Sequence, residues 1–260
     1  MKKSIIAGAL TFVAFIVLVS LGTWQVKRLA WKNALIEQLE SRVKQSPIAL
    51  QAAIDRFVKD GDVEYLPVKI RGTFLHDTEK HLYALNQQGR PGWHIYTLLE
   101  TEGSDCKDCP NQYRYVYVNR GFVPYELKNS DKRPKGRGSS KVEFVGLIRK
   151  PQIKKSYSDA DNRPLKNQWY WPSLKEMSLP SAGISNDQLK KLAPLFIDER
   201  APSIAKAKSY KWPQAGVTKL NIANRHLGYV ITWYGLALAL LGVYGFFLKG
   251  RKQQSIEDDK

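Results

Sequence analysis

Two uncharged apolar segments stand near the ends of this 260-residue chain, and they constrain its architecture more than any other feature. Residues 5–21 and 228–248 contain no charged side chain and are rich in aliphatic and aromatic residues. A helix of about 20 residues rises about 30 Å, which is the thickness of the hydrocarbon core of a bilayer. The sequence therefore predicts two transmembrane helices, one within residues 1–24 and one within residues 224–248.

The first apolar segment also resembles a cleaved secretory signal, because it follows two lysines and ends beside the small residues Ser20 and Gly22. Two observations favour a retained anchor. The apolar segment is longer than the roughly 7 to 15 residues of a signal core. The chain also continues without a break into a helical pattern that reaches about Lys44 and ends before Pro47.

Residues 25–223 form a polar middle region, and about 200 residues are enough for one soluble domain with its own core. After the opening helix come short runs rich in Val, Ile, Tyr and Phe, many with alternating apolar and polar residues, separated by turn-forming residues. This pattern predicts an antiparallel sheet or barrel. The runs are residues 64–74, 80–86, 93–100, 112–123, 141–150, 193–200 and 217–223.

The predicted fold is thus a membrane protein in which two transmembrane α-helices at the chain ends flank an antiparallel β-rich (α+β) extramembrane domain. Short helices are expected around residues 173–177 and 186–192, the second capped by Ser185 or Asn186. Residues 128–140 lack periodicity and predict an exposed, mobile loop. Residues 249–260 are expected to form a polar cytoplasmic tail.

The net charge of +17 raises the question of a polyanionic partner. The basic residues are spread along the middle region and form no nucleic-acid recognition motif, so we expect membrane lipids with anionic headgroups rather than nucleic acid. Basic residues flank the chain's apolar segments at both ends, and the positive-inside tendency places both termini on the cytoplasmic or matrix side. These residues are Lys2, Lys3, Lys249, Arg251 and Lys252.

The residues that could carry chemistry are few. His76 and His81 do not have the spacing of a zinc site. Cys106 and Cys109 favour a small disulfide at a hairpin tip, although a copper or redox role for the pair stays open. No nucleophile elbow, P-loop or dinucleotide motif is present, so an enzyme is the class that the sequence supports least.

His226 is the most informative of these residues, because it heads the second apolar segment. On a helix it shares a face with Tyr229 and Trp233, and Arg225 precedes it. One interpretation is an interfacial belt of polar-tipped rings. The other is a haem site, in which His226 ligates the iron and Arg225 pairs with a propionate.

Trp24 and Arg28 recur on one face of the helix that leaves the first span. If the two spans pair, this face is expected to stand close to His226 and to complete the same site.

Four blocks of the chain resemble the Surfeit locus protein 1 family of cytochrome c oxidase assembly factors. They are LGTWQVKRLAWKNALIEQLESRV (residues 21–43), VNRGFVP (118–124), DNRPLKNQWYW (161–171) and NRHLGYVITWYGLA (224–237). The resemblance covers nearly the whole chain, and its first and last blocks are long and specific. The cysteine pair belongs to no motif of that family, and the tryptophan-rich block contains no histidine.

The resemblance implies an inner-membrane assembly factor, or chaperone, for a haem-copper oxidase. Family members are thought to hold haem a for delivery to the catalytic subunit of cytochrome c oxidase, and the histidine at the head of the second span is a proposed haem ligand; His226 is the match here. Haem a synthase is a further possible partner. Because the apolar segment begins so near Met1, a mitochondrial transit peptide is not expected, and a bacterial inner membrane with a periplasmic domain fits best.

We therefore expect a non-enzymatic cytochrome c oxidase assembly factor that binds haem a transiently. Two alternatives stay open: a scaffold that stabilises an oxidase intermediate without binding haem, and a periplasmic thiol redox or copper-handling protein that uses Cys106 and Cys109.

Overall fold

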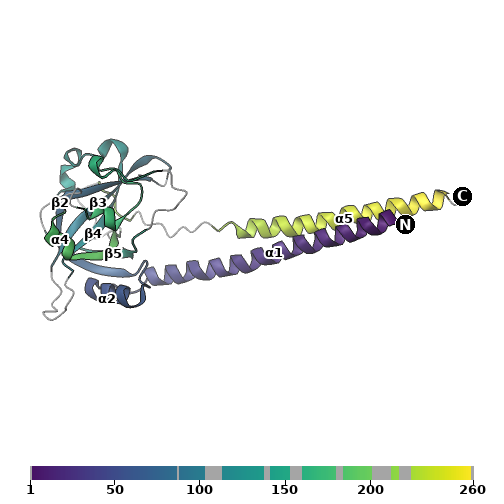
Figure 1. Ribbon diagram of the computed structural model, residues 1–260, viewed down its shortest axis with the longest axis horizontal. Helices are drawn as coiled ribbons and strands as arrows, with labels where there is room; N and C mark the ends of the chain where they lie inside the picture. The colour runs from purple at the N-terminus through teal and green to yellow at the C-terminus, as the bar shows by residue number, and fades with distance from the viewer. Residues whose placement is uncertain are drawn as a thin grey trace. The chain divides into compact units, whose positions relative to one another are not determined.

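The computed structural model describes residues 2–86, 88–102, 113–137, 141–152, 160–179, 184–200, 212–216 and 224–258 (Figure 1). Cys106, Cys109 and the strand predicted at residues 217–223 lie outside these ranges. The chain forms two compact units, one made of residues 1–39 with 220–260 and the other of residues 40–219. The expected domain boundary at residue 25 falls inside a continuous helix.

The first unit is a pair of long antiparallel helices, α1 (Lys2–Val43) and α5 (His226–Asp258), which lie side by side with their membrane-spanning ends together (Figure 1). Only 6% of the apolar window of each helix is buried, so neither is the core helix of a soluble protein. The prediction of two membrane spans flanking a sheet-rich domain is confirmed. The backbone of α5 stays helical to Asp258, through most of the polar tail predicted at residues 249–260.

The contact between α1 and α5, which we call the seam, repeats at alternating intervals of three and four residues, as in a coiled coil. Close approach depends on small residues. A side chain at Gly22 would lie 3.0 Å from the ring of Tyr234, and one at Gly8 would lie 2.8 Å from the Tyr244 hydroxyl. The positions that follow these intervals are Gly8, Thr11, Phe15, Leu18, Gly22, Gln25 and Leu29 on α1, and His226, Val230, Trp233, Ala237, Leu240 and Tyr244 on α5; Ala7, Val19, Leu21 and Tyr234 beside them are also partly buried.

The second unit is a sheet whose strand pairings close into a ring of five, in the order β2, β3, β4, β6, β5 and back to β2. Four pairings are antiparallel, as predicted, but β4 pairs with β6 in parallel and the short β1 pairs with β2 in parallel. The strands are β1 (Ile48–Ala49), β2 (Pro67–Leu85), β3 (Pro91–Thr101), β4 (Tyr115–Pro124), β5 (Val142–Arg149) and β6 (Leu192–Glu199).

The long strand β2 joins two runs that the sequence separated. Its first part pairs with β5 and its second part with β3, and the register shifts between Leu75 and Lys80. The irregularity lies within the pairing with β3, which holds residues 72–75 and 80–85 in one strand, and a bulge there bends the strand and increases its twist. The polar residues around His76 and Thr78, which looked like a turn in the sequence, lie inside the strand.

Two hydrophobic clusters cover the opposite faces of the sheet. The first includes residues from all five strands of the ring and from α2 (Leu50–Asp60), so it fills the interior of the barrel. The second packs on the outer face around the fully buried Trp169 and includes Met177 of α3 (Leu174–Met177). The predicted short helices are confirmed: Ser173 caps α3, and Ser185 forms a capping box with Gln188 at α4 (Asn186–Lys190).

The predicted loop at residues 128–140 is partly structured instead. It contains the 3₁₀ helices η2 (Ser130–Lys132) and η3 (Pro134–Gly136), which follow η1 (Tyr125–Leu127), and η4 (Pro164–Lys166) comes later in the chain. Arg133 anchors the segment, because its buried guanidinium pairs with Glu79 on β2 and donates 3.0 and 3.1 Å hydrogen bonds to the carbonyls of Leu127 and Lys128. The composition predicted a mobile loop, but the buried ion pair between Arg133 and Glu79 fixes the segment against β2.

Replacing Glu79 by Gln should destabilise the domain by about 3 kcal/mol at neutral pH, because Arg133 would be left buried without its counter-charge. Burial alone would raise the pKa of Glu79, but hydrogen bonds from His81 and Arg133 lower it below the ordinary 4.5. The stabilisation is therefore complete above about pH 4.5 and is lost as the pH falls through the folded-state pKa.

Urea unfolding of the full chain in detergent micelles, followed by tryptophan fluorescence, measures this difference. A gap between wild type and Glu79→Gln that stays constant down to acid pH would contradict the prediction, as would no gap at neutral pH.

Candidate functional site

His226 is the first residue of α5, and its side chain faces α1. Its Nδ1 lies 2.7 Å from the Oε1 of Gln25, a side-chain contact between helices 201 residues apart in the sequence. Gln25 is 8% exposed, and the imidazole is partly buried. Nε2, the other ring nitrogen, makes no hydrogen bond within the described residues.

Two further polar contacts hold the helices together on either side of this pair. The Asn224 side chain donates a 2.7 Å hydrogen bond to Asn33, and the hydroxyls of Thr23 and Tyr234 are 3.1 Å apart. Asn224 also accepts from the backbone N–H of His226 at 3.4 Å, which caps the start of α5. These contacts fix the position of α5 along α1 in the region of the imidazole.

The structure brings together only some of the residues that the sequence grouped. Trp233 shares the seam with His226, and its indole Nε1 is buried without a hydrogen-bond partner among the described residues. Tyr229 is 52% exposed, and Arg225 is exposed just before the helix. Arg225 and Tyr229 are thus exposed residues of the expected site on the same helix end as His226.

Trp24 and Arg28 lie outside the seam. Trp24 is 55% exposed, and the Arg28 guanidinium lies over the ring of Trp31 at 4.1 Å. The face that these residues share is therefore open to the surroundings, whereas Gln25 is the α1 residue in contact with His226. The sequence analysis missed Gln25. The signal was available, because Gln25 is a lone amide in the row of shielded α1 positions that begins at Gly8.

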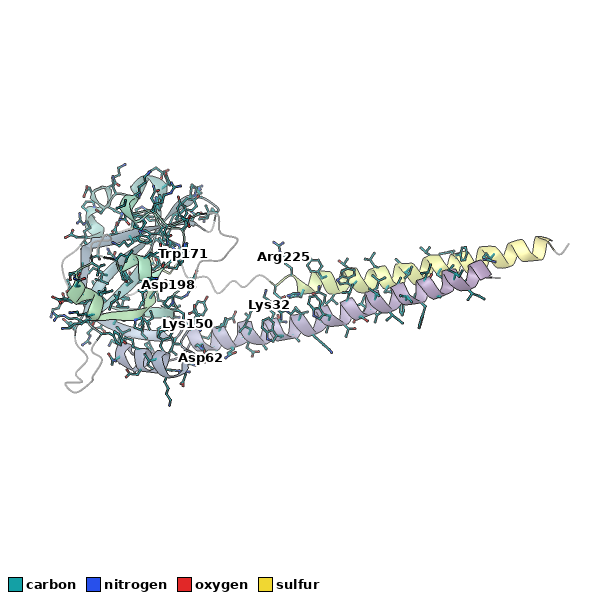
Figure 2. All side chains as sticks on the ribbon, viewed as in Figure 1. Lys32, Asp62, Lys150, Trp171, Asp198 and Arg225 are labelled. Atoms are coloured by element: carbon teal, nitrogen blue, oxygen red, sulfur yellow. The ribbon has the colours of Figure 1, made fainter. Side chains whose placement is uncertain are left out.

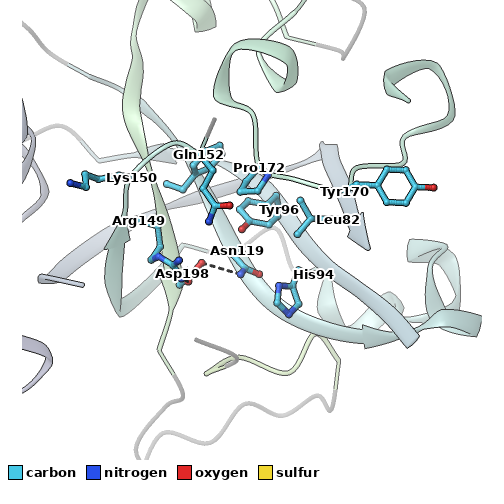
Figure 3. Close-up of a pocket in the computed structure, with 11 residues that line it drawn as sticks. Leu82, His94, Tyr96, Asn119, Arg149, Lys150, Gln152, Tyr170, Pro172 and Asp198 are labelled. Atoms are coloured by element: carbon cyan, nitrogen blue, oxygen red, sulfur yellow. Dashed lines mark hydrogen bonds and ion pairs between the residues drawn. The ribbon is translucent and has the colours of Figure 1, made fainter. Parts of the chain in front are cut away.

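A separate cavity of about 250 Å³ lies in the β domain (Figure 3). Leu82 and Phe196 supply apolar walls, and polar side chains of β3, β4, β5 and β6 gather around it. Figure 3 shows Tyr170 pointing away from the other lining residues. The polar lining residues from the strands are His94, Tyr96, Asn119, Arg149 and Asp198.

A buried ion pair organises this cavity. Asp198, only 3% exposed, accepts a 2.9 Å hydrogen bond from Arg149 and a 3.0 Å hydrogen bond from Asn119. Arg149 also donates to Glu64 at 2.8 Å. Burial alone would lower the pKa of Arg149, but the charges of Asp198 and Glu64 raise it, so the guanidinium stays charged. Figure 2 labels Asp198 and Lys150, which both line the cavity, on the β domain.

Burial sets the protonation of the other two rings. It lowers the pKa of His94 below 6.5 and raises the pKa of Tyr96, so both are neutral near pH 7. The cavity thus offers hydrogen bonds from neutral groups around an ion pair that is already compensated. A larger groove of about 830 Å³ lies on another side of His94 and is lined by aromatic residues that include Phe122 and Trp212.

Among the described residues, His, Cys, Asp and Glu side chains form no group of three that could hold a metal ion. His81 is paired with Glu79 at 2.7 Å, and His76 lies 3.3 Å from Arg120. These two histidines therefore have structural partners in the sheet. Two candidate binding sites remain in the described structure: the partly exposed imidazole of His226 on α5 and the cavity beside His94.

Comparison with known proteins connects the chain to one family. The family model described as SURF1 family matches residues 12–238. The chain is 33% identical over 229 residues to Surfeit locus protein 1 of Xenopus tropicalis, covering 85% of this chain and 68% of that protein. It is 31% identical over 226 residues to Surfeit locus protein 1 of Homo sapiens (84% and 70%), and 30% identical over 233 residues to a SURF1-like protein of Drosophila melanogaster (84% and 70%).

Replacing Gly22 by Leu should separate the helices, because even a Cβ at this position lies 3.0 Å from the ring of Tyr234. Cysteines at positions 33 and 224, where the asparagine amides are 2.7 Å apart, report the pairing by cross-linking with a short bifunctional maleimide in membranes. Cys106 and Cys109 are first changed to serine. We expect efficient cross-linking in the parent and a several-fold loss with Gly22→Leu.

The matched control is Gly235→Leu, because a Cβ at Gly235 has nothing within 4 Å. Equal cross-linking in Gly22→Leu and Gly235→Leu would mean that close packing at Gly22 does not hold the seam.

Replacing His94 by Gln should flatten the pH dependence of domain stability on the acid side of neutrality. The folded-state pKa of His94 lies below 6.5, so the unfolded chain takes up a proton first as the pH falls. Below the ordinary pKa of histidine, this residue therefore lowers the free energy of unfolding of the wild type by up to about 1.4 kcal/mol per pH unit. The variant lacks this contribution. Urea unfolding at about pH 7.5 and about pH 5.5 measures the difference. Pro172 also lines the cavity, and Pro172→Ala should keep the wild-type dependence of unfolding free energy on pH. If His94→Gln keeps that same dependence, the lowered pKa of His94 is refuted.

Proposed function

The chain belongs to the SURF1 family, whose members are known as oxidase assembly factors, and we propose that it binds haem a transiently and helps to insert it into the catalytic subunit of a haem-copper cytochrome c oxidase. Haem a is cargo in this proposal, and the protein carries out no covalent step on it. The observation that carries the proposal is the geometry of His226.

The imidazole of His226 is held from one side only. Gln25 contacts Nδ1, and Nε2 lies on the far side of the ring without a partner in the described structure. A neutral imidazole nitrogen with a free lone pair is a good axial donor to haem iron. The residues at this position therefore fit a ligand that approaches from the side opposite Gln25.

The seam limits where such a ligand lies. Gly22 packs against Tyr234 about one helical turn beyond Gln25, so the helices are in direct contact there. The exposed flank of α5 is the alternative, and it carries Tyr229, which is 52% exposed, and Arg225, which is exposed. Tyr229 offers an aromatic surface to a porphyrin, and Arg225 offers a charge to a propionate. Trp24 and Arg28, on the exposed face of α1, stay candidates for the rim of the same site.

Transient binding follows from a single protein ligand. One axial nitrogen on an open helix flank gives iron fewer bonds than an enclosed site with two, so the dissociation rate stays high enough for transfer to the oxidase. The β domain would recognise the catalytic subunit of the oxidase and, in the same role, haem a synthase. A chaperone of this kind needs no catalytic group.

We further place the chain in a bacterial inner membrane, with both termini in the cytoplasm and the β domain in the periplasm. The basic residues at both termini support this orientation through the positive-inside tendency. Anionic lipid headgroups are the expected partners of the excess positive charge, which is +17 over the chain.

The test is an absorption spectrum of the protein purified from cells that make haem a. Wild type should carry a haem signal, and His226→Ala should lose at least nine-tenths of it (on the order of 1.4 kcal/mol or more of binding energy). His94→Gln is the control, because it removes a partly buried imidazole from the other unit and should retain the signal.

A wild-type protein without haem, combined with normal oxidase assembly by His226→Ala, would favour the scaffold alternative instead. Changing Cys106 and Cys109 to serine tests the thiol hypothesis separately, and the haem proposal expects no loss of oxidase assembly from that change.

A further inference from the structure

We propose that Gln25 is a positioning residue that holds His226 as the tautomer with its proton on Nδ1, and so presents the lone pair of Nε2 to haem iron. This inference rests on the proposed function. It assigns a role to a residue of the first helix that touches the ligand histidine and not the ligand itself.

The chemistry of the Gln25 amide selects the tautomer. Its oxygen Oε1 lies 2.7 Å from Nδ1 of His226, and because a carbonyl oxygen only accepts, this contact is a hydrogen bond when Nδ1 carries the proton. A neutral imidazole carries one ring proton, so a proton on Nδ1 leaves Nε2 as a free acceptor. The other tautomer would place a proton where the iron has to bind.

The surroundings keep the amide in place. Gln25 is 8% exposed and sits on the seam between Gly22 and Leu29. The hydrogen bond from Asn224 to Asn33 and the contact of Thr23 with Tyr234 fix the position of α5 along α1 on both sides of it. The Gln25–His226 contact is thus set by the packing of the whole seam.

This arrangement is like that of histidine ligands in known metal sites, where the ring nitrogen that does not bind the metal donates a hydrogen bond to a carbonyl or carboxylate. Such partners orient the ring and make the ligand nitrogen more basic, and losing them costs about 10- to 100-fold in metal affinity. Here the partner comes from the other helix. Helix pairing and ligand presentation are therefore coupled: His226 is ready to bind iron only when α1 and α5 are packed together.

Two variants and one control test the role. Gln25→Leu removes the acceptor with little change in size, and Gln25→Glu keeps an acceptor in the same place. Thr23→Val is the matched control, because it removes a neighbouring polar contact of the seam, the one with Tyr234, while the side chains of Gln25 and His226 and the packing of Gly22 on Tyr234 stay in place. Cross-linking between cysteines at positions 33 and 224 shows, in each background, that the helices still pair.

The first measurement needs no haem. Full-length protein labelled with ¹⁵N-histidine is examined by NMR in detergent micelles at a pH where imidazole is neutral, and the signal of His226 is assigned by its loss in His226→Ala. Wild type, Gln25→Glu and Thr23→Val should show a protonated Nδ1 and a bare Nε2. Gln25→Leu should shift towards the Nε2-protonated form that neutral histidine prefers in water.

The second measurement is titration with haem a, followed by absorption. Gln25→Leu should bind about 10- to 100-fold more weakly than wild type. Gln25→Glu should bind at near wild-type strength with a lower reduction potential, because a carboxylate partner makes the imidazole a stronger donor.

The two measurements separate the two ideas. If wild type binds haem a and Gln25→Leu has the wild-type tautomer or the wild-type affinity, the role of Gln25 is overturned and the proposed function stands. If wild type shows the protonated Nδ1 but binds no haem a, the proposed function fails and the role of Gln25 towards iron fails with it.

Discussion

The packing of α1 against α5 is the constraint on which the site depends. Lipid tails are as apolar as leucine, so two membrane helices gain little from the hydrophobic effect when they pair, and close packing and hydrogen bonds must hold them instead. Gly22 provides the close approach, with Tyr234 filling the space opposite. The pairs Gln25–His226 and Asn33–Asn224 provide the hydrogen bonds. Each of these contacts also sets the position of the imidazole.

The β domain is stabilised by different means. Its five-stranded ring uses the hydrogen-bonding edges of its strands within the fold, which leaves side chains and loops as the main surface for partner recognition. Two arginines inside it are compensated locally, Arg133 by Glu79 and Arg149 by Asp198 and Glu64. Such pairs hold specific geometry at positions where an uncompensated charge would be strongly destabilising.

Much of the fold could be predicted because its signals are local. The spans follow from the length of two apolar runs, the helices at 173 and 185 from their serine caps, and most strands from alternation. Three features were missed because they depend on residues far apart in the sequence. The two runs of β2 join because β3 pairs with both of them, β4 meets β6 in parallel, and Arg133 is buried only because Glu79 lies opposite.

By itself, the sequence determined that the chain crosses a membrane twice, that a sheet-rich domain lies between the spans, and that an imidazole heads the second span. These features depend on composition and periodicity, which are properties of each segment alone. Only the tertiary structure decided which residue faces that imidazole. The sequence pointed to Trp24 and Arg28. In the structure, α1 is rotated about its axis so that Gln25 faces His226, while Trp24 and Arg28 are exposed. The rotation of a helix is set by the partner it packs against, and no segment read alone contains that information.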